Sequence, residues 1–267
     1  MKQQFHLLLT AFGFFTRIPI PYKFAFSQSY LNQCNRYLPL VGYVVGGISA
    51  SVFFASSQIF SSTVAIVLSM ITSILVTGAF HEDGLADVCD AFGGGWTKEK
   101  ILTIMKDSRV GAYGAIGIIL SLLLKFVSLN ELPHSFIIKT IIIGHVVSRT
   151  MAVWTMHSLN YVREDESSKS KPITKALHIK DLVIAGAWSI FAFIPFFDVR
   201  IFLILIPTFI TKYCLERYFK KWIGGYTGDC LGTIQQVTEQ VIYLAILALA
   251  GYVAYQSSAQ GQISNLF

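Results

Sequence analysis

Long apolar runs, separated by polar connections, follow one another along this chain of 267 residues. A transmembrane helix needs about 20 mostly apolar residues, and seven runs approach that length, at 38–57, 59–80, 110–129, 136–157, 182–197, 200–216 and 237–255. Residues 1–16 are also apolar but stop at Pro19 and Pro21, which predicts a half-length or interfacial helix. We therefore expect an all-α fold, a polytopic transmembrane helix bundle of about seven spans in a single membrane domain over residues 1–267.

The polar connections alternate in charge. Those near residues 58, 131 and 199 carry at most one basic residue, whereas the N-terminal segment and three longer connections hold most of the Lys and Arg. Because basic loops stay on the cytoplasmic side, the N-terminus and the segments at about 81–109, 159–180 and 217–236 are predicted to be cytoplasmic. Within the first of these, Thr97, Ile101 and Ile104 have the spacing of a short amphipathic helix at the membrane interface, after a glycine turn at 93–95.

Composition supports the membrane class, because 54% of the residues are hydrophobic and 13% are charged, about half the charge of a soluble domain. The net charge of +6 lies in short clusters between apolar runs. It forms no contiguous basic face, so we expect no nucleic-acid partner. The four cysteines form no CxxC pair, which indicates neither a zinc site nor a disulfide framework. The first apolar run lacks a small-residue cleavage site and does not indicate a signal peptide.

An acidic cluster, His81-Glu82-Asp83-Gly84-Leu85-Ala86-Asp87-Val88-Cys89-Asp90, follows the second run. In a helix, Asp83, Asp87 and Asp90 fall at i, i+4 and i+7 and share one face, while His81 and Glu82 point away from it. Three carboxylates repel unless a cation neutralises them, and aspartate oxygens suit magnesium, manganese or calcium. Since magnesium joins carboxylates to substrate phosphates, the face predicts a diphosphate site. The alternative is a solvated helix end stabilised by the macrodipole.

A glycine-rich segment, Gly224-Gly225-Tyr226-Thr227-Gly228-Asp229-Cys230-Leu231-Gly232, lies on the same predicted membrane face. Its glycines would let the backbone approach a phosphate, and Asp229 would add a fourth carboxylate to the metal site. The alternative is a plain turn between two membrane helices.

Three arginines are candidate phosphate contacts. Arg109, which Asp107 would orient, suits a phosphate clamp or an interfacial anchor. Arg149 lies inside the fourth run, where a charge costs about 2.5–3.5 kcal/mol on insertion scales, so it requires either an acidic partner or an anionic substrate. Arg163 suits a phosphate contact or a positive-inside anchor.

Four motifs, FFTRIPIP, HEDGLADVCDAFGGG, IMKDSRVGAYG and GGYTGDCLG, resemble those of adenosylcobinamide-GDP ribazoletransferases over nearly the whole chain. The resemblance implies an inner-membrane enzyme that requires Mg²⁺. Such an enzyme joins adenosylcobinamide-GDP to alpha-ribazole or its 5′-phosphate and releases GMP. The family's patterns fall on His81, Asp83, Gly84, Ala86, Asp87 and Asp90, on Asp107, Ser108, Arg109, Gly111 and Gly114, and on Gly224, Gly225, Thr227, Gly228, Asp229, Leu231 and Gly232. The sequence departs from the family after Arg163, where residues 164–169 replace the usual glycine.

The expected mechanism places a metal on Asp83, Asp87 and Asp229, with Asp90 as a further ligand or as the base for the ribazole hydroxyl. Arg109 and Arg163 would meet the charge of the leaving GMP. His81, Asp107, Ser108, Arg149, Gly225, Thr227 and Gly228 complete the expected substrate contacts. No residue indicates a homo-oligomer or an association with other enzymes of the corrinoid pathway.

Two alternative functions were weighed against the sequence. A CDP-alcohol phosphotransferase also clusters aspartates at a membrane surface, but its DG-xx-AR element is replaced here by Gly84-Leu85-Ala86-Asp87. A cation or metabolite transporter would place charges inside several spans, and in the sequence we identified Arg149 alone in such a position.

Overall fold

The computed structural model describes residues 2–20, 28–162 and 177–264, and the regular elements of this part of the chain are helices, with one isolated β-bridge and no strand. Its elements are α1 (Lys2–Phe15), α2 (Gln28–Cys34), the 3-10 helix η1 (Asn35–Tyr37), α3 (Leu38–Ser57), α4 (Ser62–Thr77), α5 (Phe80–Gly94), α6 (Lys98–Ile104), α7 (Ala112–Asn130), α8 (His134–Ser158), α9 (Ile179–Ile190), the 3-10 helices η2 (Phe191–Phe196) and η3 (Val199–Ile204), α10 (Leu205–Ile223) and α11 (Gly228–Ser264).

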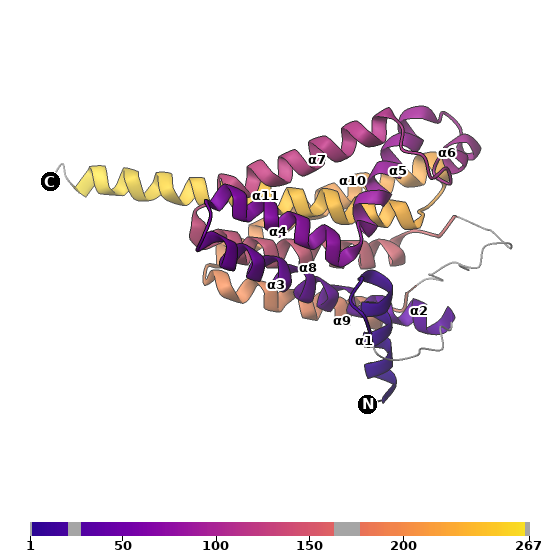
Figure 1. The fold of residues 1–267 in the computed structure, drawn as a ribbon, viewed down its shortest axis with the longest axis horizontal. Coiled ribbons are helices and arrows are strands. Elements are labelled where there is room, and N and C mark those ends of the chain that lie inside the picture. Colours follow the sequence, from indigo (N-terminus) through magenta and orange to yellow (C-terminus); the bar gives the residue numbers. More distant parts are fainter. Residues whose placement is uncertain (1, 21–27, 163–176, 265–267) are drawn as a thin grey trace.

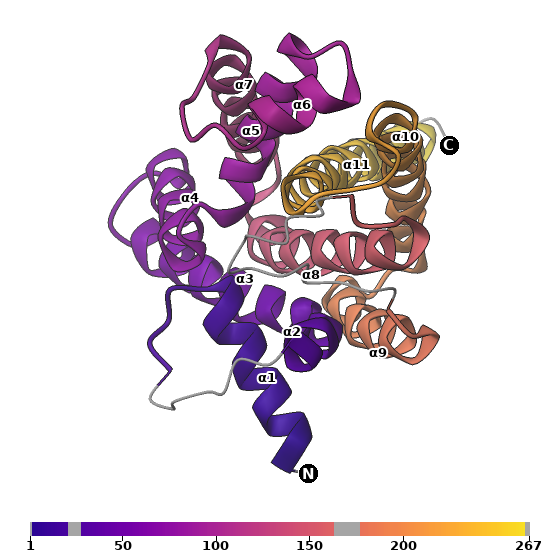
Figure 2. The ribbon, with the colours of Figure 1, turned by 90° about the vertical axis from the view of Figure 1, so that its right-hand side faces the viewer.

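The long helices run side by side as an elongated bundle, while α1 crosses one end of it (Figure 1). Helix α8 is the most enclosed and packs against α3, α9 and α11. Helices α5 and α6 and the start of α11 gather at the same end as α1, which Figure 2 shows face on. This end carries the sequence motifs, so the bundle positions the candidate site at one of its two ends.

Five described helices or helix pairs are long and apolar enough to cross a membrane: Tyr30–Ser57, Ala112–Asn130, His134–Ser158, Ile179–Phe196 and Gly228–Tyr252. A sixth span is possible where α4 and α5 follow each other with an 88° bend. The all-α multi-pass fold is confirmed. The predicted span at 200–216 differs, because α10 continues to Ile223 and carries Lys212, Glu216 and Arg217, too many charges for a simple span.

The corner between α4 and α5 depends on the N-terminal FFTRIPIP segment. Gly78 and Ala79 both adopt left-handed backbone angles there, with φ of 68° and 58°. The Arg17 backbone N–H donates to the Val76 carbonyl at 2.7 Å, and a Cβ on Gly78 would overlap the Arg17 side chain. Glycine is required at this position for both its φ and its space, and the segment holds α5 at its angle to α4.

Both predicted short helices are present. Helix α1 is a half-length helix that crosses the bundle end (Figure 1). Helix α6 is amphipathic, because Ile101 is buried while Lys98 and Lys100 are exposed. The Thr97 hydroxyl accepts the Lys100 N–H at 3.3 Å and caps it. The expected glycine turn begins late, since α5 continues through Gly94.

Candidate active site at the α5–α11 crossing

The acidic cluster is helical, as its spacing predicts. Asp83 is exposed and Asp87 and Asp90 are half-buried, whereas His81 and Glu82 are buried on the opposite side of α5. The aspartates therefore face outward at the end of the bundle, and the two flanking residues face into it. Within the described residues, no three His, Cys, Asp or Glu side chains converge on one point as a metal group does.

Helix α5 crosses the first turn of α11 at very short range. A Cβ on Gly84 would lie 3.0 Å from the Asp229 Cα, and one on Gly232 would lie 3.1 Å from the His81 carbonyl oxygen. The Thr233 hydroxyl spans the crossing and donates to the Gly84 carbonyl at 3.3 Å. The crossing places Asp229 beside Gly84, the residue after Asp83. The two motifs therefore lie close together, as the sequence predicts.

The glycine-rich segment shapes the start of α11. Gly224, with φ of 83°, ends α10 in the left-handed conformation that closes many helices. The Thr227 hydroxyl accepts the Cys230 N–H at 3.3 Å and caps α11. Gly228 faces open space at the first position of the helix, where a Cβ would meet no atom within 4 Å.

A short parallel bridge fastens this segment to the connection that follows α8. Tyr226 donates its backbone N–H to the Asn160 carbonyl at 2.9 Å, and Val162 donates to the Tyr226 carbonyl at 3.0 Å. Gly225 packs between these residues, and a Cβ there would overlap the Asn160 carbonyl oxygen. Gly225 is thus occupied in packing. Arg163, the next predicted contact along this connection, lies outside the described residues.

Asp90 has a different environment from the other two aspartates of α5. Its Oδ2 accepts the Gly111 N–H at 2.7 Å and its Oδ1 accepts the Gly114 N–H at 2.8 Å. The carboxylate caps the start of α7, where the first backbone N–H groups of a helix lack internal partners. A Cβ on either glycine would overlap this carboxylate, so the two glycines permit the contact.

The Asp107-Ser108-Arg109 turn lies at the surface beside this cap. Arg109 donates from Nη2 to Asp107 Oδ2 at 2.6 Å, and its backbone N–H donates to Asp107 Oδ1 at 3.1 Å. The hydrogen bonds from the Arg109 guanidinium and backbone lower the pKa of Asp107 to about 2. The Arg109 side chain is 87% exposed, and Ser108 is exposed as well. The Asp107 carboxylate therefore holds the Arg109 guanidinium at the surface.

Arg149 is 1% exposed in the middle of α8 and has internal partners. Its Nη1 donates to the His145 carbonyl at 2.9 Å, and Glu239 and Glu82 are the acids that interact with it electrostatically. Arg149 therefore hydrogen-bonds within its own helix, to His145, and has acidic residues of the bundle in its electrostatic surroundings.

Glu239 also binds further partners. Lys125 lies 2.5 Å from its Oε1, the Tyr243 hydroxyl donates to Oε1 at 2.7 Å, and Gln235 donates to Oε2 at 2.6 Å. The inference that Arg149 is the single charge inside the spans was wrong, because Lys125 of α7 and Glu239 of α11 are also buried there. The sequence alone could have indicated both residues, since each lies within an apolar run where an ionised residue is costly.

The buried charges connect to the acidic helix through two amides. Gln236 donates to Glu82 Oε1 at 3.0 Å and to Gln235 Oε1 at 2.9 Å. Glu82 is therefore held from the inside of the bundle, while the adjacent Asp83 faces outward. We name Lys125, Arg149, Glu239 and Glu82, with the side chains that bridge them, the interior charge cluster.

Comparison with known proteins agrees with these motifs. The family model described as Cobalamin-5-phosphate synthase matches residues 7–247. This chain belongs to that family. An adenosylcobinamide-GDP ribazoletransferase of Shewanella frigidimarina is 45% identical over 250 residues, which cover 92% of this chain and 96% of the relative. Proteins with the same description from Leptospira interrogans and Vibrio parahaemolyticus are 44% and 41% identical over 92% and 93% of this chain, and cover 96% and 94% of the relatives.

No solved structure matches this chain. Membership of the cobalamin-5-phosphate synthase family favours neither the CDP-alcohol phosphotransferase nor the transporter. The charges inside the described spans do not by themselves indicate a transporter, because Lys125 pairs with Glu239 and Arg149 has Glu239 and Glu82 in its electrostatic surroundings.

Proposed function

We propose that this chain transfers the phosphocobinamide group of adenosylcobinamide-GDP to alpha-ribazole or its 5′-phosphate and releases GMP. The observation that carries the proposal is the outward acidic face of α5, closed against the first turn of α11, in a chain 45% identical to an enzyme of that description. The ribazole hydroxyl oxygen forms a bond to the phosphorus nearer cobinamide. The bond from that phosphorus to the bridging oxygen breaks, and GMP leaves with the bond's electrons.

Magnesium suits the carboxylates at the crossing, although no three His, Cys, Asp or Glu side chains in the described residues form a preassembled metal group. Magnesium typically takes one or two carboxylates and completes its shell with water and substrate phosphates. Asp83 and Asp229, which flank the contact at Gly84, would hold it. When bound, it would neutralise the diphosphate and stabilise the charge that develops on the leaving group.

The other residues receive separate roles. Asp87, one turn further along the same face, accepts the proton of the attacking hydroxyl. Asp90 is a positioning residue rather than the base or a metal ligand, since both of its oxygens accept backbone N–H groups of α7. Arg109, exposed on its turn, contacts the phosphates of the bound nucleotide.

This assignment also orders the remaining predicted contacts. Thr227 shapes the first turn of α11 and Gly228 leaves room at its N-terminus for a phosphate. We place His81 and Arg149 outside the phosphate site, because both side chains are buried within the bundle. The site end of the bundle faces the cytoplasm of an inner membrane, in agreement with the distribution of basic connections.

The test is GMP release by purified protein supplied with adenosylcobinamide-GDP and alpha-ribazole. Release should require both the acceptor and Mg²⁺, stop when a chelator is added and resume when Mg²⁺ is restored in excess. Release at an equal rate without acceptor would indicate a hydrolase, and release that chelator leaves unchanged would remove the metal from the proposal. Substitution of Asp83 should raise the Mg²⁺ concentration required for half-maximal rate, whereas Asp87→Asn should lower kcat at every Mg²⁺ concentration.

A further inference from the structure

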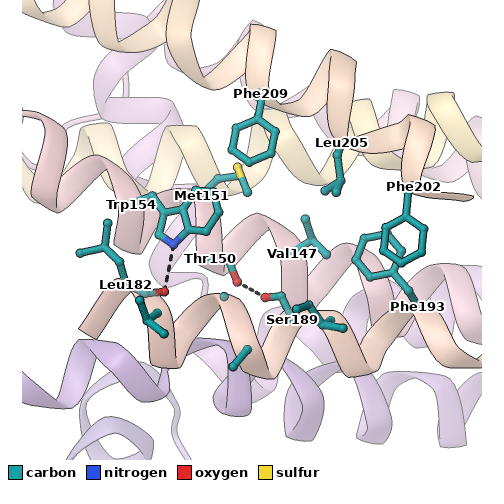
Figure 3. Close-up of a pocket in the computed structure, with 14 residues that line it drawn as sticks. Val147, Thr150, Met151, Trp154, Leu182, Ser189, Phe193, Phe202, Leu205 and Phe209 are labelled. Atoms are coloured by element: carbon teal, nitrogen blue, oxygen red, sulfur yellow. Dashed lines mark hydrogen bonds between the residues drawn. The ribbon is translucent and has the colours of Figure 1, made fainter. Parts of the chain in front are cut away.

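An apolar groove runs between α8, α9 and α10 (Figure 3). Its volume is about 540 Å³, within the range of about 300–1,000 Å³ that ligand pockets occupy. The ring of Trp154 stacks on Phe209 across one part of it, and Phe193 stacks on Phe202 at the other end.

The polar groups of this groove bond to one another. Trp154 donates its ring N–H to the Leu182 carbonyl at 3.3 Å, and the hydroxyls of Thr150 and Ser189 form a short hydrogen bond (Figure 3). The wall that remains is hydrocarbon. Because α8 and the α9–η2 pair are candidate membrane spans, the groove opens among the acyl chains of a bilayer.

A second, basic cavity of about 710 Å³ lies further along two of the helices that line the groove. The same two helices line both: α8 contributes Trp154 to the groove and Ser158 to the basic cavity, and α10 contributes Phe209 and then Lys212. Each pair is separated by about one helical turn, or roughly 5 Å. One continuous surface therefore changes from apolar to basic along α10.

The basic cavity has an excess of positive charge. Lys212 is neutralised by Glu216, whose Oε1 lies 2.7 Å from its Nζ. Arg217, Lys220 and Lys221 also line the cavity and are exposed, and the hydrogen bond that Arg217 makes goes to the neutral Tyr213 hydroxyl at 3.1 Å. Four basic residues against one acidic residue leave three positive charges at the end of an apolar groove.

We propose that this groove binds one anionic phospholipid, with an acyl chain between α8, α9 and α10 and the phosphate at Lys220 and Lys221. Basic pockets at the ends of membrane helices recognise anionic headgroups, and the apolar wall supplies the complementary surface for the chain. A diphosphate-linked substrate would not fill the apolar part. The proposal goes beyond the proposed function and does not depend on it, because it rests on the groove and on the membrane-spanning helices.

The experiment uses the full chain, stripped of lipid in neutral detergent and supplied with either phosphatidylglycerol or phosphatidylcholine, with bound lipid counted by native mass spectrometry. The wild-type protein should retain phosphatidylglycerol about 30-fold more tightly, the preference that two lysines at a membrane surface provide. Lys220→Gln with Lys221→Gln should remove this preference. The control pair Lys100→Gln with Lys106→Gln, both exposed and outside the lining of the cavity, removes the same charge and should retain the preference.

The substitution Val183→Trp tests the contribution of the apolar groove separately from that of the basic residues. Val183 lines the groove and is 66% exposed, so the larger ring fills the groove without crowding the core, and both lipids should bind less. Equal retention of the two lipids by the wild-type protein would overturn the proposal. So would glycerol phosphate binding as tightly as the lipid, or a dimer that Val183→Trp dissociates, because these outcomes assign the surface to a soluble anion or to a second copy.

Discussion

Asp83 and Glu82 are neighbours on α5, yet they belong to two different electrostatic regions. Asp83 lies in the outward acidic face, which also includes Asp87 and meets Asp229 at the crossing with α11. Glu82 lies in the interior charge cluster, where Lys125 and Arg149 balance Glu239. The outward face gathers carboxylates, an arrangement that favours a cation, whereas the interior cluster combines acids with bases. One helix therefore carries the proposed catalytic face on one side and a buried charge network on the other.

The largest expected effect is on the outward side. Asp83→Asn should lower GMP release about 10²–10³-fold, the usual loss when one electrostatic contact to a transition state is removed, and should leave thermal unfolding unchanged. Glu99→Gln is the matched control, because Glu99 is an exposed acid on α6 at the same end of the bundle. Wild-type GMP release by Asp83→Asn would eliminate the acidic face as the active site.

A substitution in the interior charge cluster should instead affect the stability of the fold. Glu239→Gln leaves Lys125 and Arg149 without their shared acid, and breaking a buried pair costs about 3–5 kcal/mol. We expect a large decrease in the free energy of unfolding in detergent, measured by denaturation. The change Lys125→Met in the same chain should recover part of this loss, since it removes one uncompensated charge. The exposed Glu131→Gln serves as the control, and equal stability of Glu239→Gln and wild type would contradict the cluster's structural role.

Asp90 lies between the two regions and allows a smaller test. Gly111→Ala should destabilise the protein by about 1–2 kcal/mol, because the new Cβ would overlap the Asp90 carboxylate and the cap of α7 would be lost. In an Asp90→Ala background, the same Gly111→Ala change should cost almost nothing. Additive costs in thermal unfolding of the single and double variants would show that the two residues act independently.

The smallest effect concerns pH. Because Arg109 lowers the pKa of Asp107 to about 2, Asp107 stays ionised from pH 5 to pH 9. The stabilisation of the turn by this pair is present above the ordinary pKa of about 3.9 and is lost only as the pH falls towards 2. Asp107→Asn should therefore lower GMP release by one constant factor over pH 5–9. A change in the shape of the pH profile would show that Asp107 titrates in that range.

The helical spacing of Asp83, Asp87 and Asp90 was enough to predict their common face, because an α-helix repeats every 3.6 residues. The spacing of residues within one helix does not show which residues of other helices they contact. The role of Asp90 depends on Gly111 and Gly114, which belong to α7, and so the sequence placed it with the metal ligands. Asp229 was added to the predicted site because its glycine-rich segment lies on the same predicted membrane face as the aspartates, and the family motifs agree with that choice.

The interior charge cluster was missed for a related reason. A search for apolar runs averages over many residues, so Lys125 and Glu239 each disappear within a hydrophobic window. Their pairing is visible only when α7 and α11 are packed together. The α10 region shows the reverse case, since a count of apolar residues predicted a span at 200–216 but did not weigh Lys212 and Glu216, which pair in the middle of the helix.

The crossing of α5 and α11 also has a consequence for biosynthesis. α11 is the final helix in chain order among those described, and it supplies both Asp229 to the acidic face and Glu239 to the interior charge cluster. While α11 is still within the ribosome, Lys125 and Arg149 are already in membrane segments, but their acidic neighbour Glu239 is not yet present. Insertion of α11 thus brings Asp229 to the proposed catalytic face and Glu239 to Lys125 and Arg149 in a single event.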